Sequence, residues 1–216
     1  MNERNNKMER LGSAPVPTAL VALGVPIMIG MLINALYNLV DAYFVGGLGE
    51  SPMGAISIVF PLGQVVVGLG LMFGNGAASY LSRLLGRGDR GTADQVASTA
   101  VYSSVMIGAV IIILAAVFMK PILTMIGATN TIMPYALPYA MIYVVFCIFH
   151  VFNVTMNNIV ASEGAAKTTM CALLLGAVLN IGLDPVFIYV FEMGVAGAAI
   201  ATAISQFVST LVYLTY

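Results

Sequence analysis

The stretch QVASTAVYSSVMIGAVIIILAAVFM, residues 95–119, decides the fold, because it carries no Asp, Glu, Lys or Arg. It is longer than the roughly 20 apolar residues that an α-helix needs to cross the hydrocarbon core of a bilayer. The whole chain shares this character: 60% of its 216 residues are hydrophobic and 8% are charged. Soluble domains carry about 25% charged residues. We therefore expect an all-α membrane protein.

Five further segments lack Asp, Glu, Lys and Arg, and the charged residues between them mark the connections. One of these segments, 121–162, is too long for a single helix and begins with the turn-rich PILTMIGATNTIMP, so its span is placed after that stretch. The pattern predicts a six-transmembrane-helix bundle that follows a polar tail at residues 1–15. The predicted spans are residues 16–42, 52–82, 94–118, 132–160, 166–190 and 195–216.

Lys and Arg are distributed unevenly over the predicted connections. Only Lys120 falls on the side opposite the N-terminal tail, and the others share the side of the tail: Arg4, Lys7, Arg10, Arg83, Arg87, Arg90 and Lys167. The positive-inside rule then places both termini in the cytoplasm of a multi-pass protein of the plasma or inner membrane. The first apolar run is longer than a signal-peptide core and is interpreted as a span. Because the basic residues form no large patch, nucleic acid is not an expected partner.

Two acidic side chains, Asp41 and Asp184, lie within the predicted spans, where charge is costly and indicates function. Asn180 precedes Asp184 by four residues and shares its helical face. Pro185 lacks an N–H and frees the carbonyl near Ile181. Carboxylate, amide and carbonyl oxygens suit Na⁺, and a carboxylate that takes up a proton suits H⁺. Two alternatives stay open: Asp41 faces water near a loop, or Asp184 has only a structural hydrogen-bonding role.

Other polar residues recur at helical spacing in the predicted spans. Ala198, Thr202 and Gln206 share one face of the last span, and the rise per residue brings Thr202 to the outer half of the bundle, as it does Asp41 and Asp184. Further polar positions on the first and fourth spans either line a cavity or join helices through hydrogen bonds. These positions are Asn34, Tyr37, Asn38, Tyr139, Asn153, Thr155, Asn157 and Asn158.

The remaining features have ordinary structural interpretations. Pro26 should kink the first span, either as a hinge or as a packing accommodation. Cys147 and Cys171 are interpreted as small packing residues, and their spacing to His150 is a weak metal signal. No nucleophile–base or zinc-ligand pattern is present, so neither an enzyme nor a cofactor is expected.

Three stretches resemble the N-terminal half of the MATE (multidrug and toxic compound extrusion) transporters: YNLVDAYFVGGLG at 37–49, SRLLGRGDRGTAD at 82–94 and LNIGLDPVFIYVFEMGVAGAAIATAISQ at 179–206. The Asp184–Pro185 pair is similar to the branch with DNA-damage-inducible and MepA-like members. The resemblance covers nearly the whole chain. It implies one six-helix lobe of a twelve-helix transporter that exports cationic, amphipathic compounds against an inward H⁺ or Na⁺ gradient.

The resemblance also implies roles for single residues. The coupling H⁺ or Na⁺ would bind at Asp41, Asn180, Asp184 and Thr202, with the carbonyl of Ala198. Pro26 would be the hinge of the first helix. The substrate cavity would be lined by Asn34, Tyr37, Tyr139, Asn153, Asn157 and Gln206.

One lobe alone offers half a cavity. The resemblance therefore implies a second six-helix lobe as partner, in the form of a missing C-terminal half or of a second copy in a parallel homodimer; membrane lipid surrounds either assembly. Two rival functions remain at this point. One is a flippase for lipid-linked precursors from the same superfamily, which would need a cationic cavity. The other is a membrane assembly partner that transports nothing.

Overall fold

The computed structural model describes residues 15–216, and all regular structure within them is helical. Most of the predicted N-terminal tail, with Arg4, Lys7 and Arg10, lies outside the described residues. The elements in chain order are α2 (Val16–Gly46), α3 (Glu50–Gly86), α4 (Arg90–Ile126), α5 (Met133–Val145), α6 (Cys147–Ser162), α7 (Ala166–Pro185), the π-helix η1 (Val186–Val190) and α8 (Gly194–Leu214).

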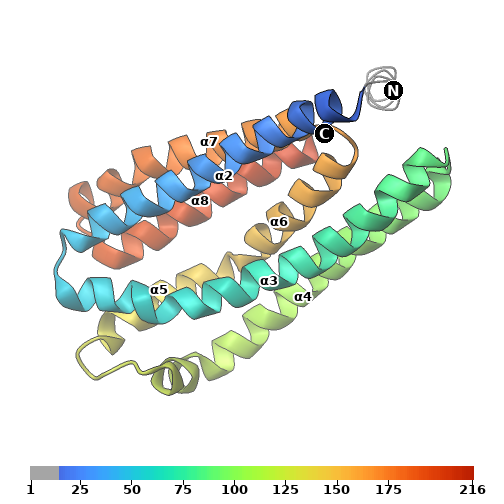
Figure 1. The fold of residues 1–216 in the computed structure, drawn as a ribbon. Coiled ribbons are helices and arrows are strands. Elements are labelled where there is room, and N and C mark those ends of the chain that lie inside the picture. The colour runs from blue at the N-terminus through green and yellow to red at the C-terminus, as the bar shows by residue number, and fades with distance from the viewer. Residues whose placement is uncertain (1–14) are drawn as a thin grey trace.

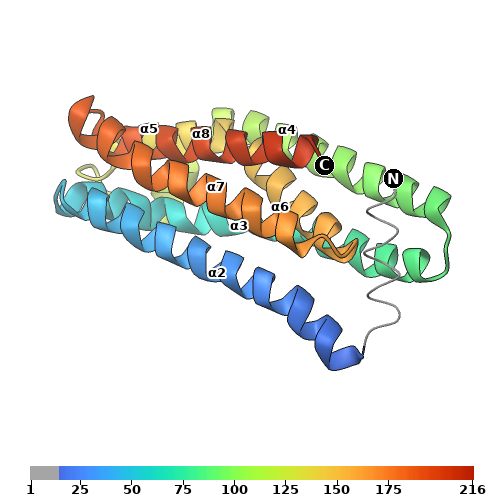
Figure 2. The same cartoon turned by 90° about the horizontal axis from the view of Figure 1, so that it is seen from above.

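The helices lie roughly along one direction in two groups (Figure 1). One group holds α2, α7 and α8, and the other holds α3, α4, α5 and α6. Within the groups, α2 packs mainly on α7, and α3 packs on both α4 and α6. Contacts of α8 with α5 and α6 join the two groups. In both Figure 1 and Figure 2, the start of α2, the α3–α4 turn and the C-terminus lie at one end of the molecule, which we call the terminal end. The opposite end is called the far end.

Five helices of the described chain are long and apolar enough to cross a membrane: α2, α3, α4, α8, and α7 continued through η1. The pair α5 and α6 makes a sixth span if it is counted as one helix bent by 50°. The chain is therefore an all-α membrane protein with the architecture of a six-span lobe. At the bend, residues 143–149 include neither Pro nor Gly. Hydropathy therefore predicts one continuous helix over 132–160, where the structure has two.

Both α3 and α4 are longer than the predicted spans. At its C-terminal end α4 continues past Lys120 to Ile126, so the first part of the stretch that the sequence analysis took as turn-rich is helical. At the other end, the α3–α4 turn is built by helical residues beyond the apolar segments. Helical structure continues to Gly86 and restarts at Arg90, although charged residues begin at Arg83. Asp89 caps α4, because its carboxylate accepts hydrogen bonds from the Thr92 amide (3.1 Å) and hydroxyl (2.8 Å). These bonds lower the pKa of Asp89, so its negative charge is kept at the N-terminus of α4, where the helix dipole favours it.

Small residues let the helix backbones approach closely at the interfaces. A Cβ atom at Gly70 of α3 would lie 2.7 Å from the Cβ of Val154 in α6. The Thr155 hydroxyl donates a 3.3 Å hydrogen bond to the carbonyl of Gly70 at the same crossing. A Cβ atom at Gly176 of α7 would collide with the hydroxyl of Ser209 in α8. The helix spacing therefore depends on glycine at these crossings.

The α3–α6 crossing gives a matched pair of variants. Gly70→Ala should lower the stability of the complete gene product by about 1–3 kcal/mol, because the added methyl overpacks a rigid contact. Gly68→Ala should leave stability equal or slightly higher, since nothing lies within 4 Å of its Cβ position and Ala favours helix. Thermal unfolding in detergent measures both. Equal melting temperatures for the two variants would contradict the close approach of α3 and α6.

Candidate functional site

Asp184 is completely buried near the end of α7, and Asn180, one turn earlier, is 2% exposed. The amide nitrogen of Asn180 donates hydrogen bonds to Asp184 Oδ1 and to Thr202 Oγ1, each at 3.2 Å. Because Thr202 belongs to α8, the amide joins the carboxylate of α7 to the neighbouring helix. The structure thus brings together three residues that the sequence proposed for one site.

Three buried oxygen atoms in this region have no hydrogen-bond partner within the described part of the chain. They are Asp41 Oδ1 from α2, and Asn180 Oδ1 and Asp184 Oδ2 from α7. Asp41 and Asp184 are also close enough for their charges to interact. Buried acceptors without donors are costly. A proton or a small hard cation between the carboxylates would supply the missing partner, and the oxygens present fit such a guest.

The backbone around Asp184 departs from the regular α-helix. Pro185 has no N–H and ends α7, and η1 continues as a π-helix whose Phe191 amide donates to the carbonyl of Val186 at 2.9 Å. Short π-helical segments are frequent at functional sites. Gly197 of α8 packs directly on this segment, because a Cβ there would lie 2.6 Å from the Phe187 carbonyl oxygen. Ala198 is 1% exposed, one turn before Thr202 on the same face of α8.

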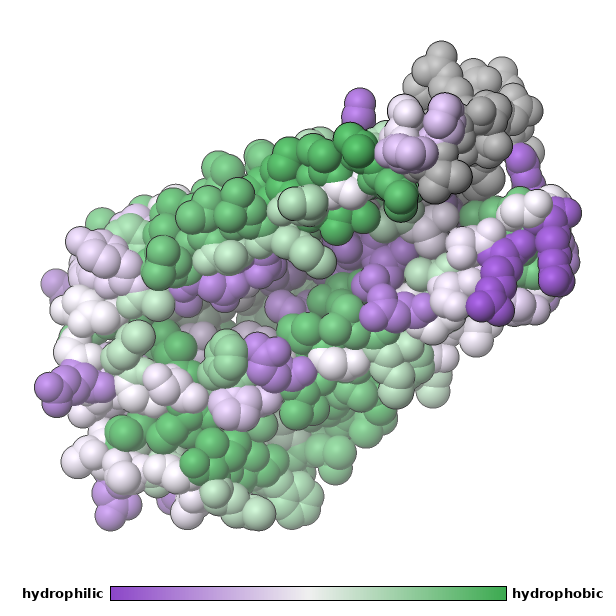
Figure 3. All heavy atoms as spheres, viewed as in Figure 1, coloured by the Kyte–Doolittle hydropathy of each residue, from purple (hydrophilic) through white to green (hydrophobic). Residues whose placement is uncertain are grey.

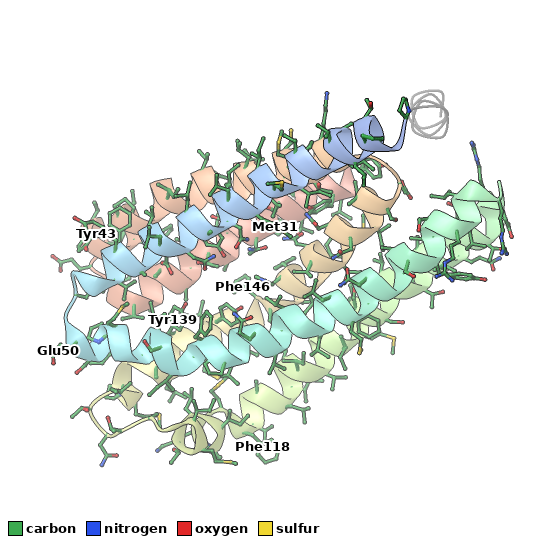
Figure 4. All side chains as sticks on the ribbon, in the orientation of Figure 1. Met31, Tyr43, Glu50, Phe118, Tyr139 and Phe146 are labelled. Carbon is green, nitrogen blue, oxygen red and sulfur yellow. The ribbon has the colours of Figure 1, made fainter. Side chains whose placement is uncertain are left out.

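Aromatic side chains enclose the carboxylates. Tyr37, one turn before Asp41 on α2, lies within electrostatic reach of both Asp41 and Asp184. Tyr139 of α5 also lies within reach of the two carboxylates and stacks on Tyr143 with ring centroids 6.3 Å apart. We call Asp41, Asn180 and Asp184, with Tyr37 and Tyr139 beside them, the carboxylate cluster. Tyr139 is absent from the cavity wall, to which the sequence analysis assigned it. Figure 4 shows Tyr139 between α5 and the group of α2, α7 and α8.

A cavity of about 340 Å³ opens beside this cluster, between the two groups of helices. Figure 3 shows hydrophilic side chains gathered in the hollow, with hydrophobic surface on either side of it. Asn180 and Thr202 line the cavity as well as contacting each other, so the carboxylate cluster and the cavity share a wall. In Figure 4, Met31 lies on the side of α2 that faces the hollow. Five of the six proposed cavity residues line it: Asn34, Tyr37, Asn153, Asn157 and Gln206.

The amide side chains of α6 line the cavity and also form hydrogen bonds to α8. The Asn153 nitrogen donates to the backbone oxygen and to Oε1 of Gln206, each at 2.8 Å, and its oxygen accepts from the Thr210 hydroxyl at 2.9 Å. The Asn157 nitrogen donates to the Tyr213 hydroxyl at 3.1 Å. Both interpretations of these polar residues, cavity lining and interhelical hydrogen bonding, therefore apply to the same side chains.

The first helix carries the proposed hinge and forms part of the cavity wall. Pro26 is buried inside α2, and Gly30, one turn later, approaches α7 closely, since a Cβ there would lie 2.8 Å from Leu173 Cδ1. At its far end, α2 is held by the Tyr189 hydroxyl of η1, which donates to the Phe44 carbonyl at 2.6 Å. Asp41 lies between these two contacts along the helix.

The sequence interpretation weighed His150 only as a weak metal signal and did not assign it to the cavity, which it lines from the first turn of α6. The signal was available: His150 precedes Asn153 by three residues and Asn157 by seven, so all three share a helical face. Among the described residues, no group of three or more His, Cys, Asp or Glu side chains is placed to hold a metal ion. Cys147 is buried and Cys171 is exposed, both as free thiols.

Residues 26–186 match the family model described as MatE. The chain is 33% identical over 204 residues to the multidrug export protein MepA of Staphylococcus aureus strain MRSA252, and the match covers 94% of this chain and 45% of that protein. The chain thus spans about half the length of the curated relatives it matches, and it corresponds to the N-terminal half of such a transporter.

Two solved structures share the fold at 35% identity and a TM-score of 0.90, each covering 94% of this chain and 45% of the other. One is a MOP superfamily transporter from Pyrococcus furiosus, for which reverse polarity of the binding pocket suggests a different function. The other is the outward-facing conformation of a multidrug resistance transporter of the same superfamily.

Replacing Asn180 tests the buried network. Asn180→Leu should destabilise the complete gene product by about 1–3 kcal/mol, because Asp184 Oδ1 and Thr202 then lose a donor in a buried place. Asn38→Leu is the matched control, since that amide is exposed and its hydrogen bonds, to Asn34 and Tyr37, stay within its own helix. Thermal unfolding in detergent compares the two. A smaller loss for Asn180→Leu than for Asn38→Leu would contradict the network.

Proposed function

Because the chain belongs to the MatE family, we propose that it forms the cation-binding half of a transporter that exports cationic, amphipathic compounds in exchange for H⁺ or Na⁺. The observation that supports this is the set of three buried, unpartnered oxygens of Asp41, Asn180 and Asp184 beside the cavity. Ionisable groups inside a membrane mark ion pathways and proton relays. A site that shares residues with a substrate cavity supplies a physical link between the two.

The coupling would follow from Asn180, which bonds to Asp184, and from Thr202, which bonds to Asn180, because both also line the cavity. A cation on Asp41 and Asp184 would draw in the oxygen of Asn180 and pull α2 toward α7, because Asp41 belongs to α2. Met31, Asn34 and Tyr37 would move with α2, so the cavity would narrow and release its contents. Pro26 would be the hinge. The cation shifts this equilibrium only by binding the narrowed state more tightly.

The wall of the cavity supports cationic cargo. Its described lining holds amides, hydroxyls, methionine and tyrosine, and includes no Lys or Arg. Aromatic faces and amide oxygens attract organic cations. A flippase for lipid-linked precursors, the rival within the superfamily, would need basic groups for phosphate. A membrane assembly partner would have no use for the unpartnered carboxylate oxygens.

A second six-helix lobe would complete the cavity, either as the rest of a longer chain or as a second copy in a parallel homodimer. The terminal end carries Arg83, Arg87 and Lys167 at its turns, and the positive-inside rule assigns that end to the cytoplasm of the plasma or inner membrane. The carboxylate cluster would then lie in the outer half of the membrane.

Neutralising Asp184 should abolish the exchange. In cells that express the complete gene product, Asp184→Asn should reduce export of a cationic dye such as ethidium to the level of cells without the protein, because Asp41 alone then remains to bind the cation and the α7 side of the pair can no longer gain and lose charge. Glu50→Gln is the control, since this carboxylate is exposed at the start of α3 and, like Asp184, lies toward the far end of the molecule. Undiminished export by Asp184→Asn, at equal expression, removes Asp184 from coupling.

The driving ion is a separate prediction. Right-side-out vesicles with the complete gene product should export ethidium when a gradient of the coupling ion is imposed inward, and only then. A pH gradient that drives export without Na⁺ assigns H⁺, and a Na⁺ gradient that drives it at equal pH assigns Na⁺. Export that needs neither gradient would contradict an antiporter.

A further inference from the structure

His150 lines the cavity and can form hydrogen bonds, but it is not one of the residues of the proposed cation site. It lies in the first turn of α6, directly after the bend, and is half-buried. Its ring lines the 340 Å³ cavity and also a space of about 10 Å³ behind it, against Tyr143 and Cys147. The second space is too small for more than a single water molecule. Only the main cavity has room for a ligand on this ring.

The two ring nitrogens differ in their surroundings. Nδ1 is buried and has no hydrogen-bond partner among the described residues. A buried N–H without an acceptor is rarer in proteins than an acceptor without a donor, so the lone pair belongs on Nδ1. In a neutral imidazole the proton then lies on Nε2, which becomes a donor. An aromatic neighbour of His150 is Tyr143, whose ring lies 6.4 Å away at 47°.

The amides nearest to His150 on the same face hydrogen-bond to other residues of the described chain. Asn153 and Gln206 bond to each other, and Asn157 bonds to Tyr213. None of them takes the Nε2 proton of His150. The donor is therefore available to a molecule in the cavity, and an oxygen acceptor on that molecule would satisfy it.

We propose that Nε2–H of His150 binds an acceptor oxygen of the exported molecule, a carboxylate best of all, and thereby favours zwitterionic amphiphiles over purely cationic ones. This inference rests on the proposed export function. Hydrogen bonds to a carboxylate are about twice as strong as those between neutral groups. The described lining includes no Asp or Glu that would repel an anionic group. The cationic end of the same molecule would face Tyr37 and Asn180, on the side of the two buried carboxylates.

Two dyes that differ in one group test the proposal. Rhodamine 19 carries a free carboxylate, and rhodamine 6G is its ethyl ester. Binding to the purified complete gene product and export from cells are measured for both dyes. His150→Phe keeps a ring against Tyr143 and removes the donor. It should weaken rhodamine 19 binding and export by about tenfold or more, and change rhodamine 6G by less than about twofold. His150→Gln should restore the preference, because its amide nitrogen occupies the place of Nε2.

Phe149→Leu serves as the control for packing in α6, since Phe149 contacts Phe207 and does not line the cavity. It should change both dyes equally or not at all. An equal loss of both dyes in His150→Phe, or no loss in either, overturns the role of His150 while the proposed function stands. Wild-type protein that neither binds nor exports either dye overturns the proposed function, and this inference with it.

Discussion

The burial of one carboxylate constrains much of this structure. Asp184 lies wholly inside the bundle, and within the described chain only one of its oxygens has a protein donor, the amide of Asn180. Replacing that donor by an apolar group would leave a buried acceptor without a partner, at a cost of about 1–3 kcal/mol. The same place cannot hold a permanent positive side chain and still exchange an ion. A neutral amide, a hydroxyl and a second carboxylate are the set that leaves room for a mobile positive charge.

The irregular backbone beside Asp184 serves this arrangement. A regular α-helix satisfies each carbonyl internally and offers none to a ligand. Pro185 removes one donor, and η1 widens the following turn, while Gly197 lets α8 approach the widened segment. In a membrane such irregular backbone is tolerated only where protein covers it or where it lines a cavity. Here α8 supplies the cover, and the same approach brings Thr202 to Asn180.

The sequence predicts those parts of the site that depend on helical period alone. Asn180 and Asp184 share a face because they are four residues apart, and Asn153 and Asn157 do so for the same reason. The pairing of α2 with α7 depends on tertiary packing, for which hydropathy carries no signal. The bend at Phe146 has no Pro or Gly to mark it, and it separates Tyr139 of α5 from the cavity wall formed by α6. The spacing of His150 to Asn153 and Asn157 marks a shared helical face, but spacing alone does not show that this face borders a cavity.

The position of α2 explains how a small charge change could move a whole wall of the cavity. Most side chains of α2 are exposed in this chain, and its main partner is α7. Displacing a helix that buries few side chains disturbs little hydrophobic contact, so its position depends on a few specific interactions. Those interactions are the approach of Gly30 to Leu173, the hydrogen bond from Tyr189 to Phe44, and the charges of Asp41 and Asp184. Of the three, only the charges would change if a cation bound. Under the proposed function, α2 would therefore respond to the occupancy of the carboxylates more than any other wall of the cavity would.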